Sequence, residues 1–228
     1  LAEDGEILAT YTLDTNPRDW EDLAAGWNEE LGSEALYIGD VGDNARQRSS
    51  ISVLVLPEPA VDASQDAVSE TVSEFSTMTL TYPDEESHNC ETLAYDPRTG
   101  SLIIVTKSGD GESHVFEKPA PHQDGTSTEL TWLRTLDFGT APLTGSANTT
   151  AGAFSPLGDR FIVRTYSDAW IWVRDGSESL AEALDGEVCD ADSPPESQGE
   201  AIGFTPDGAG YVTISEGTGS PVLFTPLQ

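Results

Sequence analysis

Basic residues are scarce in this sequence. Among its 228 residues, 10 are Lys or Arg and 41 are Asp or Glu, which gives a formal net charge of −31 at pH 7. Proteins that bind nucleic acids neutralise phosphates with clustered Lys and Arg, and anionic membrane surfaces attract the same side chains. The composition therefore excludes nucleic acid as a partner and argues against binding to a membrane surface.

Long apolar runs and cysteines are also scarce. No stretch approaches the roughly 20 apolar residues of a membrane span, so no membrane insertion is expected. The two cysteines, Cys90 and Cys189, lack the paired spacing of metal ligands and are too few for a disulfide scaffold. They allow one disulfide, and the sequence leaves open whether it forms. The sequence starts at Leu1 with neither an initiator methionine nor a signal peptide, so processing or truncation is expected.

Helical periodicity is nearly absent, and one short helix is expected, over residues 177–184. Short runs rich in Val, Ile, Thr, Tyr and Trp recur instead between turn signals, which is typical of β-strands. The sequence therefore predicts an all-β protein.

An internal repeat organises these strands. Residues 90–100, 149–158 and 199–208 each combine a short apolar segment with a Pro-x-Gly or Pro-x-x-Gly turn, and a second and a third apolar segment follow each turn. Proline presets φ for a turn and glycine supplies its positive φ. Outer strands are expected at residues 75–82 and 129–138. Four antiparallel strands per repeat are typical of a propeller blade.

A divergent fourth copy begins at residues 19–24 and continues through residues 35–40 and 51–56. We therefore expect a single β-propeller domain over residues 1–228, with inner strands that begin near residues 19, 89, 149 and 199. Four repeats are recognised and a fifth blade is left open. Residues 6–13 resemble an isolated outer strand, which predicts that the N-terminus closes the ring.

Equivalent positions of the repeat predict an acidic rim on the central channel. The start of an inner strand and the end of the second strand lie at the same edge of a hairpin. The first set of equivalent residues is Glu21, Glu91, Thr150 and Glu200, and the second set is Asp40 with Asp43 and Asn44, Lys107, Arg164 with Asp168, and Glu216.

A divalent cation, most simply Ca²⁺, would relieve the repulsion among these carboxylates, because Ca²⁺ takes six to eight oxygen ligands. The alternative is an ion-pair network in which Lys107 and Arg164 neutralise the glutamates. Residues 40–44 alternate acidic and small residues as calcium loops do, but they are equally consistent with a turn closed by Asx caps. The predicted metal ligands are Glu21, Glu91, Glu200, Glu216, Asp40, Asp43 and Asn44.

His88 is the candidate catalytic residue. It stands three residues before Glu91, where an imidazole would act as a general base on a metal-bound water or substrate. The alternative is an ordinary surface histidine. The sequence contains no nucleophile elbow, Walker loop or dinucleotide fingerprint.

Four motifs resemble a family of secreted or periplasmic-type bacterial β-propellers whose members mostly lack an assigned activity. They are Asp-Trp-Glu-Asp at residues 19–22, Gly-Asp-Val-Gly-Asp-Asn at 39–44, Glu-Thr-Leu with Asp-Pro-Arg-Thr-Gly at 91–100, and Gly-Glu-Ala-Ile with Pro-Asp-Gly at 199–208. The chain is also remotely similar to calcium-dependent lactonase and gluconolactonase-like propellers. That resemblance implies a metal held near the central tunnel.

Together these features favour an extracytoplasmic propeller that binds a divalent cation at its rim and acts as a binding or scaffold module. Its ligand there would be a protein, a glycan or a small molecule. The alternative is a metal-dependent hydrolase of esters or lactones. The high acidity fits either calcium-rich water outside the cell or adaptation to high salt.

Overall fold

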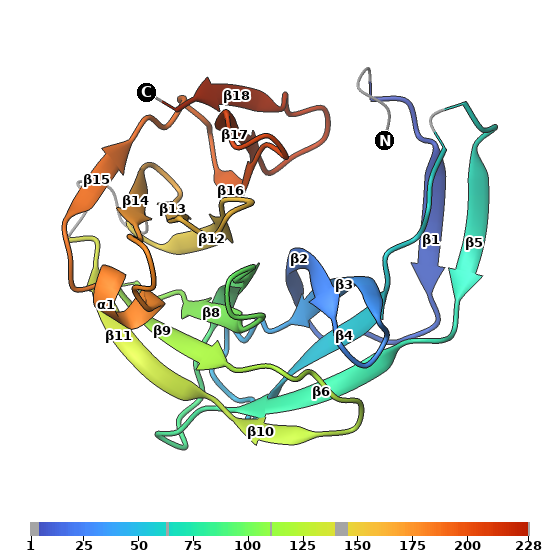
Figure 1. The fold of residues 1–228 in the computed structure, drawn as a ribbon, viewed down its shortest axis with the longest axis horizontal. Coiled ribbons are helices and arrows are strands. Elements are labelled where there is room, and N and C mark those ends of the chain that lie inside the picture. Colours follow the sequence, from blue (N-terminus) through green and yellow to red (C-terminus); the bar gives the residue numbers. More distant parts are fainter. Residues whose placement is uncertain (1–4, 63, 110, 140–145, 228) are drawn as a thin grey trace.

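In the described residues the fold is a β-propeller of four blades built from antiparallel sheets. The repeat predicts the propeller, and the structure decides the blade number that the sequence left open. The computed structural model describes residues 5–62, 64–109, 111–139 and 146–227. Figure 1 shows the blades arranged around a common axis, with β2, β12 and β16 close to the centre. Each inner strand packs against the next, in the order β2, β7, β12 and β16.

The first two blades are complete sheets. Blade 1 has the order β10-β6-β4-β3-β2, and blade 2 has the order β11-β9-β8-β7. The strand β10, which follows blade 2's third strand in sequence, pairs in parallel with β6 and so ties blade 2 to blade 1. The strands are β2 (Trp20–Asn28), β3 (Ser33–Asp40), β4 (Ile51–Pro57), β6 (Ser76–Thr81), β7 (Cys90–Tyr95), β8 (Leu102–Thr106), β9 (Glu112–Lys118), β10 (Ser127–Glu129) and β11 (Thr131–Asp137).

The last two blades differ in size. Blade 3 has the order β12-β13-β14-β15, and in the described residues blade 4 has three strands in the order β16-β17-β18. The strands are β12 (Thr149–Phe154), β13 (Arg160–Thr165), β14 (Ala169–Val173), β15 (Val188–Ala191), β16 (Gly199–Phe204), β17 (Gly210–Ser215) and β18 (Leu223–Pro226).

Local sequence explains the hairpins and the single helix. The glycines that end the three repeated turns, Gly100, Gly158 and Gly208, all have positive φ, which L side chains rarely adopt. The helix α1 (Leu180–Ala183) lies within the expected residues 177–184, and Ser179 and Glu182 form a capping box at its start. Among the described residues this helix is too short to cross a membrane.

The N-terminal strand does not close the ring as expected. β1 (Ala9–Leu13) pairs in parallel with β5 (Val68–Val72), which belongs to the long insertion of blade 1. The pair stands beside blade 1 at the right of Figure 1. Turn chemistry predicts hairpins between neighbouring strands, but it carries no information on pairing between strands that are far apart in sequence.

The core lies between successive blades. β7 and β8 are buried along almost their whole length, whereas β2 alternates between buried and exposed residues. Leu23 and Trp27, on the exposed face of β2, are 55% and 49% exposed. Cys90 and Cys189 are free cysteines, one buried and one exposed, so the disulfide that the sequence allowed does not form.

Candidate functional site

A β-bulge recurs at the start of all four inner strands. In each blade the pairing register between the first two strands shifts by one residue, so that one inner-strand residue is left unpaired. The extra residue of a bulge is released from the ladder, and its side chain can be re-aimed. The four bulge residues are Glu21, Glu91, Thr150 and Glu200.

These four residues line one pocket, which we call the rim pocket. Its volume is about 420 Å³. The repeat in the sequence therefore corresponds to a repeated backbone feature that aims one side chain per blade at the same space. The residues that line the rim pocket are Glu21, Asn44, Glu91, Lys107, Thr150, Tyr166, Gln198, Glu200 and Glu216.

The electrostatics of the rim pocket are dominated by unneutralised carboxylates. Burial, together with the neighbouring carboxylates of Glu91 and Asp19, raises the pKa of Glu21 to about 7. Burial also raises the pKa of Glu91 and of Glu200. Among the described lining residues Lys107 is the one basic side chain, so it can neutralise a single glutamate.

Lys107 is held by two acceptors. Its Nζ donates to Glu91 Oε1 at 2.6 Å and to Tyr166 Oη at 2.6 Å. Burial alone would lower the pKa of Lys107, but the hydrogen bonds to Glu91 and Tyr166 raise it above its usual value. The expected ion-pair network is therefore present for Glu91.

The other side of the rim pocket has no basic residue among those that line it. Gln198 Nε2 donates to Glu200 Oε1 at 2.8 Å and also to Glu216 Oε2, so one amide bridges the two carboxylates. Arg164, the second basic residue expected at the rim, instead forms a buried pair with Glu196 at 2.8 Å. The Arg164 guanidinium also fills the space where a Cβ at residue 199 would lie, which explains why residue 199 is glycine.

Asp40 and Asp43 are not among the residues that line the rim pocket. Their carboxylates instead accept hydrogen bonds from nearby backbone amides. Asp40 accepts hydrogen bonds from the Arg18 and Asp19 amides and pairs with Arg48 at 2.8 Å. Burial would raise the pKa of Asp40, but these donors lower it below its usual value.

Asp43 closes the turn in the same loop. Its Oδ2 accepts from the backbone amides of Gln47 and Arg48, each at 2.7 Å. This corresponds to the capped turn that the sequence left open as an alternative to a calcium loop. Of the motif at residues 39–44, Asn44 lines the rim pocket. Gly42 leaves room for the carboxylates of Glu21 and Asp19, with which a Cβ at this position would clash.

His88 is also not among the residues that line the rim pocket. Its Nε2 lies 2.8 Å from Asp84 Oδ2, and its ring contacts those of Tyr82 and His114. Among the described residues, Asp84, Glu86 and His88 are the group of three ligand-type side chains whose ligand atoms all lie within 4.8 Å of one another. The glutamates of the rim pocket are not gathered that closely.

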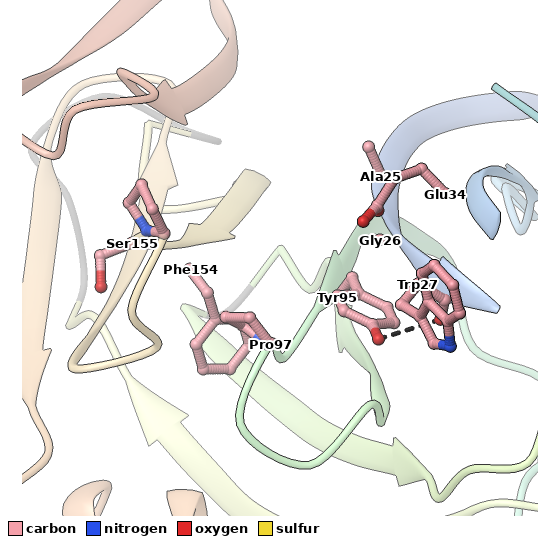
Figure 2. A pocket seen from close by; sticks show the side chains of 9 residues that line it. Ala25, Gly26, Trp27, Glu34, Tyr95, Pro97, Phe154 and Ser155 are labelled. Atoms are coloured by element: carbon pink, nitrogen blue, oxygen red, sulfur yellow. Dashed lines mark hydrogen bonds between the residues drawn. The ribbon is translucent and has the colours of Figure 1, made fainter. Parts of the chain in front are cut away.

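A second pocket, of about 370 Å³, lies at the opposite ends of the inner strands. Figure 2 shows Trp27 and Tyr95 on one side of it and Phe154 and Ser155 on the other. The Tyr95 hydroxyl donates to the Trp27 carbonyl at 3.0 Å. The two ends of the inner strands thus differ in chemistry, one acidic and one aromatic. Sequence reasoning missed this pocket, because its residues belong to the strand ends and turns of three blades.

Comparisons with known proteins find only distant structural similarity. No family model and no curated protein match this sequence. Among solved structures, the β-propeller domain of Myceliophteria thermophila Cps50 (Swd1) is 15% identical, with a TM-score of 0.44, over 92% of this chain and 54% of that one. A protein from Bacteroides uniformis described as a candidate 6-phosphogluconolactonase is 14% identical, with a TM-score of 0.47, over 90% and 52%. The chain thus spans about half the length of these two structures.

Proposed function

We propose that this protein is an extracytoplasmic β-propeller that acts as a binding or scaffold module. In this proposal the rim pocket binds a divalent cation, with Ca²⁺ as the first candidate. The observation that carries the proposal is the recurrent bulge, which aims Glu21, Glu91 and Glu200 at one pocket. Repeated placement of like charges in a half-buried space is costly unless a cation or protons compensate.

The spacing of the carboxylates is relevant to how an ion would be held. Glu21, Glu91, Glu200 and Glu216 line the same pocket without forming a tight three-ligand group. Ca²⁺ accepts flexible coordination and retains water molecules. A cation in a pocket of about 420 Å³ would therefore use some of the glutamates directly and others through water, with room left for a ligand atom from a protein, glycan or small molecule.

Thermal melts test the proposal. At about pH 8 and fixed ionic strength, millimolar Ca²⁺ should raise the melting temperature relative to excess chelator, because a ligand that binds the native state stabilises it by RT ln(1 + [L]/Kd). The increase should disappear in a Glu21→Gln, Glu200→Gln double variant. A series in NaCl separates this effect from general adaptation to salt, which would act equally with and without Ca²⁺.

Asp84→Asn is the matched control, because it removes one exposed carboxylate from the group Asp84, Glu86 and His88. The control should keep the full Ca²⁺ response. If wild type shows no response, or if the response is lost in Asp84→Asn and kept in the double variant, Ca²⁺ binding in the rim pocket is refuted.

A second candidate function is a hydrolase of esters or lactones that uses the same pocket. The pKa of Glu21, raised to about 7 by burial, favours it, because a carboxyl group in this range exchanges protons at neutral pH. In this alternative Glu21 would replace His88 as the proton acceptor, and Glu91, Glu200 and Glu216, which line the same pocket, would hold the metal. Metal-dependent turnover that is lost in Glu21→Gln and kept in His88→Ala would favour the hydrolase over the binding module.

A further inference from the structure

Lys107 occupies part of the rim pocket, and specific contacts fix the position of its side chain. It follows β8, and its backbone amide donates to the Asn89 carbonyl at 2.9 Å. Its Nζ bonds to both Glu91 and Tyr166 and lies 4.6 Å from the centre of the Tyr166 ring. The side chain is 12% exposed. This is a built subsite for a cation, with a carboxylate and a phenolic hydroxyl, and the protein's own ammonium group fills it.

An external cation must compete with this ammonium group. Glu91 is 6% exposed as a residue and its Oε1 already accepts from Lys107, so a metal ion that uses that oxygen has to displace Nζ. A metal ion elsewhere in the rim pocket still meets the positive charge of Lys107 at close range, in surroundings that screen charge less than water does.

We propose that Lys107 is a tethered competitor that sets the affinity of the rim pocket for external cations, with Tyr166 as the residue that holds it in place. This inference rests on the proposed function. Lys107 would then lower the affinity of the rim pocket for a metal ion without binding the ion itself. The contact between Lys107 and Tyr166, which joins two blades, would have a role in metal binding.

The second lysine of the chain supplies a contrast. Lys118 Nζ donates to the carbonyl oxygens of Pro119 and Pro121 and is not among the residues that line the rim pocket. A purely structural lysine at position 107 would behave in the same way, since its removal would change stability and leave cation affinity unchanged. Lys118→Gln therefore controls for the loss of one positive charge from the chain.

Calorimetric titration with CaCl₂ at about pH 8 and fixed ionic strength tests the inference. Lys107→Gln should bind Ca²⁺ about tenfold more tightly than wild type. Tyr166→Phe keeps the positive charge of Lys107 but removes one of its two hydrogen-bond acceptors, so the affinity of this variant for Ca²⁺ should rise by a smaller factor. Lys107→Arg and Lys118→Gln should not gain affinity. Circular dichroism of each variant verifies that it is folded, and Tyr166→Phe keeps the test open if Lys107→Gln is unfolded.

The outcomes separate this inference from the proposed function. If wild type binds Ca²⁺ in the rim pocket and neither Lys107→Gln nor Tyr166→Phe binds more tightly, the inference is overturned and the proposed function stands. If only Lys107→Gln binds, the inference stands, and the wild-type protein is not a Ca²⁺ binder under these conditions. If neither wild type nor Lys107→Gln binds, both are overturned.

Discussion

The carboxylates behind the rim and those that line it have opposite surroundings. Asp40 accepts from two backbone amides and from Arg48, and these donors lower its pKa. Glu21, a neighbour in space, faces Glu91 and Asp19, and its pKa is raised to about 7. Both residues belong to motifs that look equally acidic in the sequence. The difference teaches that the donors around a carboxylate, more than its charge, separate a structural role from a binding role.

The largest effect on stability is expected at Asp40, a compensated carboxylate, by which we mean one whose charge is neutralised by hydrogen-bond donors and a paired cation. Asp40→Ala would leave Arg48, whose side chain is 4% exposed, as a buried charge without its carboxylate. Breaking a buried pair in this way costs about 3–5 kcal/mol, and the lost amide acceptors add to the cost. Urea unfolding monitored by circular dichroism measures the change. Glu216→Gln, at the rim, is the control and should change stability little, and equal losses in both variants would contradict the comparison.

A smaller effect on stability is expected at His122, a buried histidine that is not among the residues that line the rim pocket. Its Nε2 lies 2.6 Å from the Gly100 carbonyl oxygen, and burial lowers its pKa to about 4. The unfolded chain binds a proton near pH 6.5 while the folded chain does not, so stability is lost as the pH falls towards 4.

His122→Gln removes this titration. Relative to that variant, wild type should lose at most about 3 kcal/mol more stability between about pH 7 and pH 4. Unfolding curves collected across this pH range provide the measurement. Parallel pH profiles for the two proteins would show that His122 is not kept neutral by the fold.

The smallest effect on stability is expected at Glu21, an uncompensated carboxylate. Because the folded pKa is raised, ionisation of Glu21 opposes folding once the pH exceeds its unfolded value. Glu21 is only partly buried, so solvent screens much of this penalty, whereas His122 is buried. In excess chelator, Glu21→Gln should therefore raise the melting temperature slightly at about pH 8 and not at about pH 4. A loss of stability at pH 8 would instead place Glu21 with the compensated carboxylates and would remove the contrast with Asp40.

The repeat made much of the architecture predictable. The turns that end in Gly100, Gly158 and Gly208 mark hairpins through local chemistry, so inner and second strands follow from short stretches of sequence. Residues at equivalent positions of a repeat reach equivalent places, which is why Glu21, Glu91 and Glu200 could be grouped as rim residues before their bulges were known. The pairing of β1 with β5 involves strands distant in sequence, and no local signal reports it.

The roles of individual polar side chains were less predictable. His88 stands close to Glu91 in sequence, but its imidazole pairs with Asp84, and it is not among the residues that line the rim pocket. Arg164 occupies the end of a second strand, as Lys107 nearly does, but it finds Glu196 on a neighbouring loop. Sequence position determines where a backbone goes, whereas a long side chain selects its partner among groups that only the folded chain brings near.

By itself, the sequence determined an acidic, all-β repeat protein and predicted one glutamate at the rim from three of its four recognised repeats. Turn chemistry, strand patterning and repetition are local properties, and they suffice for that result. Only the tertiary structure decided which carboxylates are compensated, since the Arg48 guanidinium, the Lys107 ammonium and the backbone amides around Asp40 and Asp43 reach their acceptors through folding. The net charge of −31 thus describes the whole surface, and the arrangement of a few donors defines the candidate site.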